Sequence, residues 1–284
     1  MSRAAQDSAI TQDDYGSTRG CLHPLVMPWL DRVHHGDNTE VLSGFPAECV
    51  DLVVTSPPYD DLRTYGGHSW NFETLAAQLV RVLKPGGVIV WVVADATVNG
   101  SETLTSMRQA IHFKDVCGLN VHDTMIYQKS VCPFPDTNRY YQGWEYMMIL
   151  SKGAPKCFTP LKDRINRSSG RTVTGTVRNK DGTTSAKVCL GNNISETGVR
   201  FNVWLIDDGS RQSEHPAPFP ERLAKDHVVS WSNPGDVVLD PFAGSGTTLR
   251  AAKDLNRHYI GIEINEDYLR IINQRLAQDV LALA

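Results

Sequence analysis

Two short segments of this chain combine residue types that could do chemistry with a placement that would expose them. Thr-Ser-Pro-Pro-Tyr at 55–59 follows the largely apolar run 50–54, and Asp-Pro-Phe-Ala-Gly-Ser-Gly-Thr-Thr at 240–248 follows the run 237–239. Short β-branched runs of this kind predict buried strands, so each segment should be a loop at the carboxyl end of a strand. Because open α/β sheets bind their ligands at that edge, both segments are candidate functional loops.

The first loop presents hydrogen-bond acceptors in a stiff frame. Ser56 Oγ and the Pro57 carbonyl can accept, while Pro57 and Pro58 have fixed φ angles and no N–H that would compete. An amino group on a heteroaromatic ring is a poor nucleophile, and acceptors around its nitrogen would draw its protons and favour a pyramidal geometry. Tyr59 could stack on such a ring. The alternative is that the two prolines form only a rigid turn.

The second loop is suited to a nucleoside-like cofactor. Gly244 and Gly246 would let the backbone approach a ligand closely, although Gly-x-Gly alone is a weak signal. The loop lacks the Gly-Lys-Ser/Thr sequence of a phosphate-binding ATPase loop. Glu263 ends the next predicted strand, where its carboxylate could accept both ribose hydroxyls.

The elements that would position these loops alternate along the chain. Strands are predicted at 50–54, 88–94, 121–128, 145–150, 237–239 and 259–264, and helices at 71–83, 102–117, 221–231, 247–256 and 267–276. The segment 84–87, Lys-Pro-Gly-Gly, should be a turn. This alternation predicts an α/β fold with a doubly wound, mainly parallel sheet. No internal repeat is evident.

The alternation stops between about 151 and 212, which predicts an insert of loops and short strands. Between Lys152 and Arg200 there are ten basic and three acidic residues, although the whole chain has a net charge of −4. A basic insert on an acidic body suits contact with DNA, and a solvated loop is the alternative. The candidate DNA-binding residues are Arg164, Arg167, Arg171, Arg178 and Lys180. The expected organisation is a tail at 1–20, a catalytic half at 21–150, the insert at 151–212 and a cofactor-binding half at 213–284.

Composition narrows the classes of protein further. The longest apolar run, 88–94, is too short to span a bilayer, and residues 1–20 lack the apolar core of a secretion signal. Six cysteines have no metal-knuckle spacing, which disfavours zinc, and we expect reduced thiols in a cytoplasmic protein.

Segment 240–248 closely resembles the S-adenosylmethionine loop of the β-group DNA amino-methyltransferases, the cytosine-N4 and adenine-N6 enzymes of restriction-modification systems. The order of catalytic loop, basic insert and cofactor loop is also that of the β group. The resemblance implies the S-adenosylmethionine-dependent methyltransferase fold, with the insert as target-recognition region. It implies a cofactor site formed by Asp37, Phe219, Asp240, Phe242, Ala243, Gly244, Ser245, Gly246, Thr247 and Glu263. Phe219 lies in 215–220, which resembles the motif that lines the methionine end of the cofactor. For Asp37, a helix N-cap is nearly as good an interpretation.

The resemblance assigns the catalytic role to Ser56, Pro57, Pro58 and Tyr59, with Asp95 hydrogen-bonded to Ser56 or, alternatively, capping a helix. It implies a base flipped out of double-stranded DNA, and no metal. Tyr127, Lys129, the stretch 134–144 and Glu145 could form a wall for that base, although aromatic residues at strand ends are usually core.

Serine at the head of the Pro-Pro loop favours cytosine N4 over adenine N6. Methylation at cytosine C5 is disfavoured because the chain has no Pro-Cys nucleophile. RNA or protein methylation is a lesser alternative, and a non-catalytic DNA-binding protein on this fold is an alternative of another class. A cognate restriction endonuclease and a homodimer are possible partners.

Overall fold

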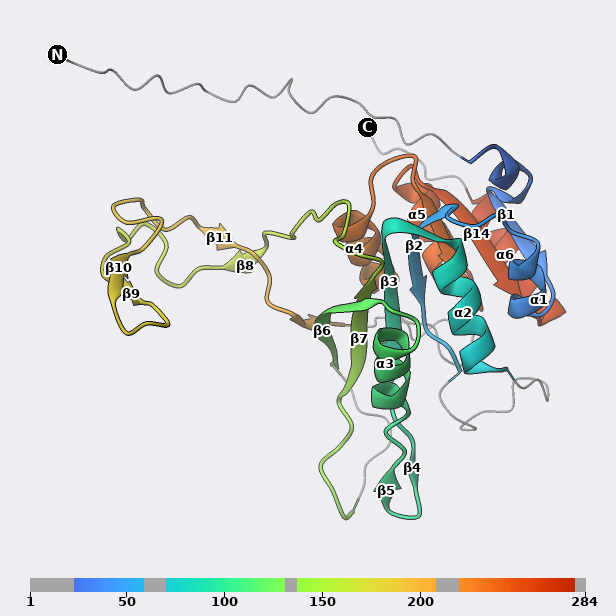
Figure 1. Ribbon diagram of the computed structural model, residues 1–284, viewed down its shortest axis with the longest axis horizontal. Helices are drawn as coiled ribbons and strands as arrows, with labels where there is room; N and C mark the ends of the chain where they lie inside the picture. The colour runs from blue at the N-terminus through green and yellow to red at the C-terminus, as the bar shows by residue number, and fades with distance from the viewer. Residues whose placement is uncertain (1–22, 59–69, 131–136, 208–219, 279–284) are drawn as a thin grey trace.

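The structure is a computed structural model that describes residues 23–58, 70–130, 137–207 and 220–278. Its centre is an eight-stranded sheet in the order β1-β14-β13-β2-β3-β7-β6-β12 (Figure 1). The strands are β1 (Arg32–His35), β2 (Val50–Thr55), β3 (Leu83–Val93), β6 (Asn120–Lys129), β7 (Trp144–Ser151), β12 (Val203–Ile206), β13 (Val237–Asp240) and β14 (His258–Glu263). In this sheet β7 pairs antiparallel with β3 and with β6, and the other five pairs of neighbouring strands are parallel. The predicted mainly parallel sheet is therefore confirmed.

Helices cover both faces of the sheet because alternate strand residues point to opposite sides. In β2, Val53 packs with helices α1 (Asn38–Ser43), α2 (Phe72–Val82) and α3 (Thr105–Asp115), together with the 3₁₀ helix Pro24–Trp29. Leu52 and Val54 pack on the other face, against α4 (Glu221–Trp231) and α5 (Thr247–Asp254). Helix α6 (Glu266–Ala277) packs beside α5 and completes that second layer. The fold is therefore doubly wound, as the sequence predicts.

The chain winds in opposite directions from the two central strands. From β2 it passes through α2 to β3, whereas from β13 it passes through α5 to β14, on the other side. Strands β2 and β13 are direct parallel neighbours, with Leu52 paired to Val238 and Val53 to Leu239. Their carboxyl ends therefore meet at the point where the strand order reverses, which is where such sheets bind ligands.

Three local differences from the sequence prediction have physical reasons. Segment 84–87 lies within β3 instead of forming a separate turn, since Gly86 adopts φ +75° and the β2–β3 register shifts there. The helix expected from 102 begins at Thr105 because 97–102 form a hairpin of β4 (Thr97–Val98) and β5 (Ser101–Glu102). Strand β1 has no apolar run, Arg-Val-His-His, and was not predicted.

The insert projects from the sheet edge as an arm (Figure 1). The arm contains the pairs β8 (Arg164–Ile165) with β11 (Thr197–Gly198) and β9 (Thr176–Arg178) with β10 (Thr184–Ala186). Strand β12 lies within the range expected for the insert but belongs to the main sheet, where Trp204 and Ile206 are buried. The expected tail at 1–20 lies outside the described residues. Among the helices that the structure describes, none has the length and apolar character to cross a bilayer.

Candidate active site and arm

The two candidate loops are tied to each other through buried hydrogen bonds. Thr55 Oγ1 donates to Asp240 Oδ1 at 2.7 Å, and Thr248 Oγ1 donates to the Val54 carbonyl at 3.1 Å. Thr55 and Thr248 are fully buried. Ser56 follows Thr55 directly, so the position of its loop depends on the position of the glycine loop.

Asp240 holds this junction from inside the protein. Its side chain is 2% exposed, and its Oδ1 also accepts the Phe242 N–H at 3.1 Å. Burial raises the pKa of the Asp240 carboxyl to about 6, while the hydrogen bonds from Thr55 and Phe242 oppose that rise. The structure thus gives Asp240, predicted as a cofactor contact, an internal role in joining the loops.

Glu263 stands at the end of β14 beside the glycine loop. Its Oε2 accepts the Gly244 N–H at 2.7 Å, and its Oε1 accepts the Asn265 N–H at 2.8 Å. Burial raises the pKa of Glu263, and these backbone hydrogen bonds oppose the rise. An ionised carboxylate offers about four acceptor positions, and the backbone N–H groups of Gly244, Asn265 and Ile264 use up to three of them, so acceptor capacity remains for a ribose hydroxyl. The site therefore fits a ribose, with Gly244 at φ +52° allowing the loop to turn beside it.

Helix α6 braces the glycine loop from behind. Gly246 has φ +78°, and a Cβ there would lie 3.0 Å from Ile272 Cγ2, so only glycine fits without a shift. Arg275 Nη1 donates to the Ser245 carbonyl at 3.1 Å and to Thr247 Oγ1 at 3.0 Å. Ser245 and Thr247 are predicted cofactor contacts. The Ser245 carbonyl and the Thr247 hydroxyl instead accept hydrogen bonds from α6. Arg275 was not predicted, because its helix shows only an ordinary amphipathic pattern.

Phe242 of the glycine loop is half-buried and packs against the hydrophobic core. Its ring packs edge-on against Trp70, with centroids 5.1 Å apart, and Trp70 in turn lies 6.3 Å from Trp91. Ala243 is nearly buried and donates its N–H to the Ile262 carbonyl at 3.0 Å. Tyr59 and Phe219 lie outside the described residues.

Asp37 and Asn38 bring α1 to the same edge. Asp37 Oδ1 accepts the N–H groups of Thr39 at 2.8 Å and Glu40 at 3.1 Å, so the N-cap interpretation is confirmed. Asn38 Nδ2 donates to the Pro241 carbonyl at 3.3 Å. Asn38 thus links α1 to the glycine loop, a contact that the sequence did not predict.

Asp95 has the second of its two expected roles, capping a helix. Its Oδ1 accepts the Ser106 N–H at 2.8 Å, and its Oδ2 accepts Ser106 Oγ at 2.6 Å. The carboxylate therefore accepts one backbone N–H of the first turn of α3, whose N-cap Leu104 has no capping side chain. The β4–β5 hairpin brings the two together by returning the chain to the end of β3. Ser56 and Pro58 are half-buried and Pro57 is buried, directly after Thr55.

The residues expected to form a base-holding wall are partly core. Tyr127 is 3% exposed and packs in the core beneath α4, as its alternative interpretation holds. Lys129 Nζ pairs with Glu145 Oε1 at 2.5 Å across neighbouring strands. In the described part of the aromatic stretch, Tyr140 is fully exposed and Tyr141 is 57% exposed.

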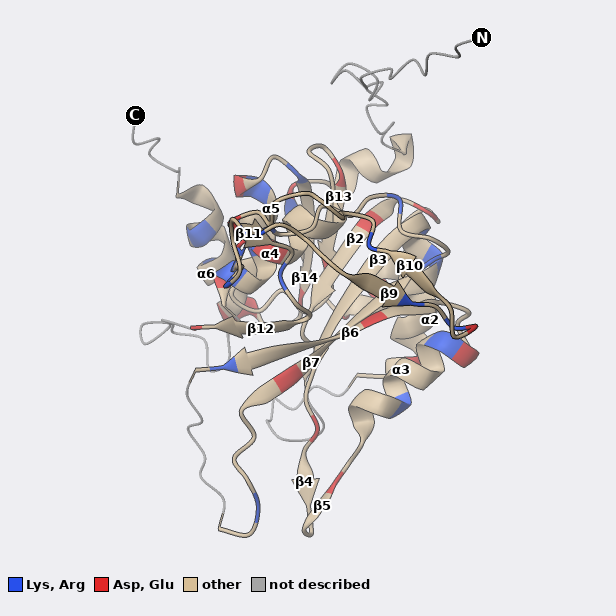
Figure 2. Cartoon of the chain, turned by 90° about the vertical axis from the view of Figure 1, so that its left-hand side faces the viewer, with Lys and Arg blue, Asp and Glu red and all other residues tan. Residues whose placement is uncertain are grey.

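The predicted DNA-binding residues of the arm fall into two groups. Arg164 is engaged at the root, where its Nε donates to the Val199 carbonyl at 2.9 Å and its guanidinium lies 4.5 Å from the Phe201 ring centre. The other four are exposed; they are Arg167, Arg171, Arg178 and Lys180. Figure 2, in which the arm faces the viewer, marks its basic residues in blue.

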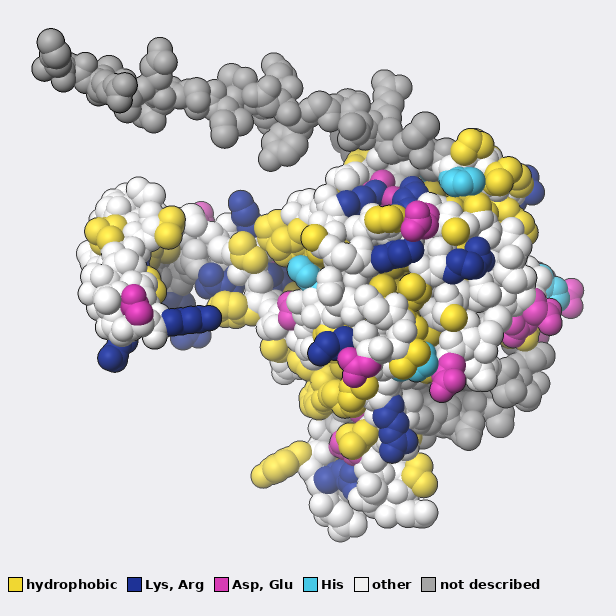
Figure 3. All heavy atoms as spheres, in the orientation of Figure 1, with side chains coloured by type: hydrophobic (Ala, Val, Ile, Leu, Met, Phe, Trp, Pro, Cys, Tyr) yellow, Lys and Arg dark blue, Asp and Glu magenta, His cyan; other side chains and the backbone are white. Residues whose placement is uncertain are grey.

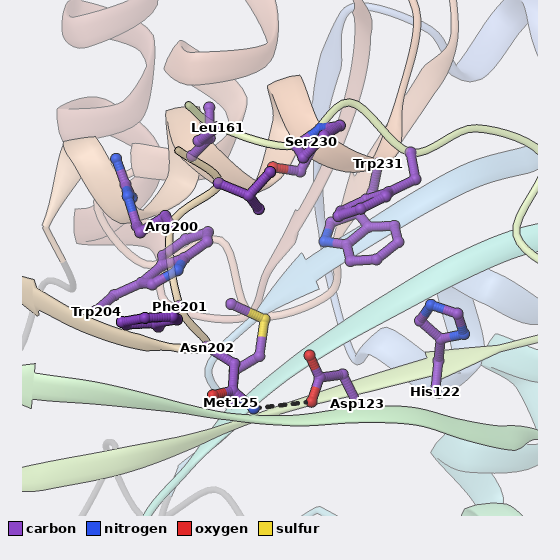
Figure 4. A pocket seen from close by; sticks show the side chains of 13 residues that line it. His122, Asp123, Met125, Leu161, Arg200, Phe201, Asn202, Trp204, Ser230 and Trp231 are labelled. Atoms are coloured by element: carbon purple, nitrogen blue, oxygen red, sulfur yellow. Dashed lines mark hydrogen bonds between the residues drawn. The ribbon is translucent and has the colours of Figure 1, made fainter. Parts of the chain in front are cut away.

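The arm root is anchored to the body beside a pocket between β6, α4 and the returning chain (Figure 4). Arg200 lies over the Trp204 ring at 4.8 Å and pairs with Asp226 of α4 at 2.6 Å and with Asp163. Asn202 Nδ2 donates to Asp123 Oδ1 at 3.2 Å, the dashed line in Figure 4. These contacts fix where the arm leaves the sheet.

Comparison with known proteins agrees with this arrangement. Residues 50–274 match the family model of the N6/N4 methyltransferases, described as DNA methylase. The orphan methyltransferase M.BamHII of Bacillus amyloliquefaciens is 52% identical over 241 residues, covering 82% of this chain and 90% of that protein. The DNA adenine methyltransferase YhdJ of Escherichia coli (strain K12) is 30% identical over 263 residues, covering 85% and 81%.

Among solved structures, TTHA0409 of Thermus thermophilus, crystallised in complex with S-adenosyl-L-methionine, matches with a TM-score of 0.61 and 28% identity. The match covers 88% of this chain and 95% of that one. The chain therefore belongs to the N6/N4 DNA methylase family, whose methyl donor is S-adenosylmethionine.

Proposed function

We propose that this DNA methyltransferase transfers the methyl group of S-adenosylmethionine to the exocyclic N4 of a cytosine flipped out of double-stranded DNA. The observation that carries the proposal is the Thr55–Asp240 hydrogen bond, which joins the Ser-Pro-Pro loop to the glycine loop at the switch point of the sheet. A donor held at one loop and an acceptor base held at the other would then lie within a single, preorganised site.

The catalytic residues act on the amine of the base. Ser56 Oγ and the Pro57 carbonyl accept its hydrogens, so that the nitrogen lone pair is less delocalised into the ring and free to attack. The sulfonium of the bound cofactor supplies the electrophilic methyl group. The amine then loses a proton to water, and no covalent enzyme intermediate is needed. Tyr59 is proposed to stack on the flipped base.

The cofactor is proposed to lie against the glycine loop. Glu263 keeps acceptor capacity beyond its backbone bonds to Gly244, Asn265 and Ile264, and that capacity would bind the ribose hydroxyls. Phe242, half-buried two residues before Gly244, is proposed to add an apolar contact to the cofactor. Asp37 and Phe219 are also proposed to contact the cofactor. The other candidates of the glycine loop would contact it through their backbone rather than their side chains; they are Asp240, Ala243, Gly244, Ser245, Gly246 and Thr247.

The choice of cytosine N4 rests on Ser56. A short hydroxyl stands where adenine-N6 enzymes more usually carry a carboxylate or carboxamide. Adenine N6 is the second candidate, because YhdJ, a relative at 30% identity, is described as an adenine methyltransferase.

The decisive experiment is to incubate the purified chain with methyl-labelled cofactor and unmethylated plasmid DNA, and to identify the product by nucleoside mass spectrometry. Labelled N4-methylcytosine is the expected product. N6-methyladenine would overturn the proposed base while keeping the reaction class. Ser56→Ala, which keeps the fold contacts of Thr55, is the matched control for enzyme-dependent product.

The arm is proposed to be the target-recognition region. It carries the four exposed basic residues named above and leaves the body as a separate projection (Figure 1). Exposed basic side chains on such a projection are suited to the phosphates of a duplex.

A further inference from the structure

The arm is built from two copies of one backbone unit, although the sequence shows no evident repeat. The N–H of Gly170 bonds to the carbonyl of Ile194 at 2.9 Å, and the N–H of Gly191 bonds to that of Val173 at 3.1 Å. The N–H of Val173 donates to the carbonyl of Asn192 at 2.8 Å, and the N–H of Ile194 donates to the carbonyl of Arg171 at 2.9 Å. Each bond of one strand thus has a counterpart 21 residues away in the other. Residues 170 and 191 are thus equivalent, as are 173 and 194.

The equivalence extends to a turn in each strand of the arm. Segments 167–170 and 188–191 are both turns, and they end at glycines with φ +80° and +86°, a conformation that side-chain-bearing residues rarely adopt. Between them lies the bridge Thr172–Asn193, whose side chains share a hydrogen bond of 3.2 Å. The arm is therefore a two-stranded ribbon with a local two-fold axis near that bridge.

The two turns differ sharply in their side chains. The basic turn, 167–170, is Arg-Ser-Ser-Gly, and the apolar turn, 188–191, is Val-Cys-Leu-Gly. In the apolar turn Val188 is 103% exposed and Leu190 is 51% exposed. None of the arm residues between 164 and 198 is buried, so these apolar groups have no core of their own. Figure 3 shows the arm as a projection that carries both dark-blue and yellow side chains.

Exposed apolar groups beside exposed arginines indicate a polyanionic partner that also offers apolar surface. Duplex DNA has both, in its phosphates and in the thymine methyl groups of the major groove, and that groove admits a two-stranded β-ribbon. We infer that the ribbon enters the major groove and that its two turns divide the work. The basic turn contacts backbone phosphates, and the apolar turn contacts base edges. This inference rests on the proposed DNA-methylating function.

Arg167 and Val188 occupy equivalent positions, which permits an exchange experiment. The variants are Arg167→Val, Val188→Ser and the double exchange Arg167→Val/Val188→Arg, with Arg270→Val of α6 as a control for loss of an arginine. Arg270 is exposed and pairs with Asp267 of its own helix. DNA binding is measured against salt on cognate and scrambled duplexes, the cognate site being identified by sequencing methylated DNA.

Arg167→Val should flatten the log–log salt slope by about 0.9 and leave the preference for the cognate duplex unchanged, since phosphate contacts carry no sequence information. Val188→Ser should leave the slope unchanged and lower the preference roughly tenfold. The double exchange keeps the charge of the arm but should not restore the preference. A double exchange that matches the wild type, or a Val188→Ser variant with full preference, would overturn the division of work.

Failure of the inference on the arm can be distinguished from failure of the proposed function. Each variant should bind S-adenosylmethionine as the wild type does, because the exchanged side chains are exposed and distant from the glycine loop in the chain. A wild-type chain that methylates no DNA refutes the proposed function. A wild-type chain that methylates DNA and whose exchange variants keep slope and preference refutes the inference on the arm alone.

Discussion

Replacing Thr55 with valine tests the link between the two loops. Valine keeps the shape of threonine but removes the hydroxyl that donates to Asp240 Oδ1 at 2.7 Å. Thr55 is fully buried, so bulk water cannot reach this position and donate to Asp240 Oδ1 in place of the lost hydroxyl. A hydrogen bond to a charged group contributes about 1.5–3 kcal/mol, whereas one to a neutral group contributes about 0.5–1.5 kcal/mol.

The cost of this substitution should depend on pH. Burial raises the pKa of Asp240 from an ordinary 3.8 to about 6, and the Thr55 hydrogen bond opposes that rise. Because the folded-state pKa lies above the unfolded value, the carboxyl group contributes stability below pH 4 that is lost as the pH rises through about 6. Thr55→Val should raise the folded pKa further and deepen that loss. We expect a destabilisation of about 1 kcal/mol at about pH 4.5 and about 2–3 kcal/mol at about pH 8.

The measurement is urea unfolding at both pH values, compared with wild type and with Thr55→Ser. Serine loses the methyl group but keeps the donor, so its cost should be the same at both pH values. The reasoning is refuted if Thr55→Val costs the same at the acidic and the alkaline pH, or if Thr55→Ser shows an equal pH dependence.

Three further substitutions probe the site itself. Ser56→Ala should retain cofactor affinity and slow single-turnover methyl transfer by about 10²-fold or more, and transfer at the wild-type rate would exclude a catalytic role. Glu263→Ala should weaken S-adenosylmethionine binding about 10- to 100-fold by calorimetry, since it removes charge-assisted bonds, and an unchanged Kd in a folded variant would contradict the ribose assignment. Arg275→Met should raise the KM for the cofactor several-fold with a smaller effect on kcat, and Arg275→Lys should recover part of it. A fall in kcat alone would assign Arg275 to catalysis rather than to bracing the loop.

The sequence predicts the layout of the site because periodicity and loop position are local signals. The apolar runs 50–54 and 237–239 predict strands, and the loops at their carboxyl ends are then placed by the rule for doubly wound sheets. Glu263 follows from the same reasoning, since it ends a third predicted strand. For these residues, local pattern and global fold agree.

What the sequence did not predict depends on contacts between distant segments. Helix capping was one of two roles expected for Asp95, but the hairpin of β4 and β5 that brings Ser106 of α3 to its carboxylate was not predicted. Arg275 and Asn38 reach the glycine loop from helices that show no unusual residue pattern. Arg164, grouped with the exposed arginines by its charge, is held at the arm root by Phe201.

The structural repeat in the arm is also not evident from the sequence. Its two units share glycines and hydrogen bonds but differ in charge and polarity, so comparing residue types does not align them. A backbone unit that must turn at a positive φ constrains only the glycine, here Gly170 and Gly191, and leaves the other turn positions free. An arm with no buried residue has no packing constraint either. Substitutions in its turns should therefore change what the arm contacts without changing how the body folds.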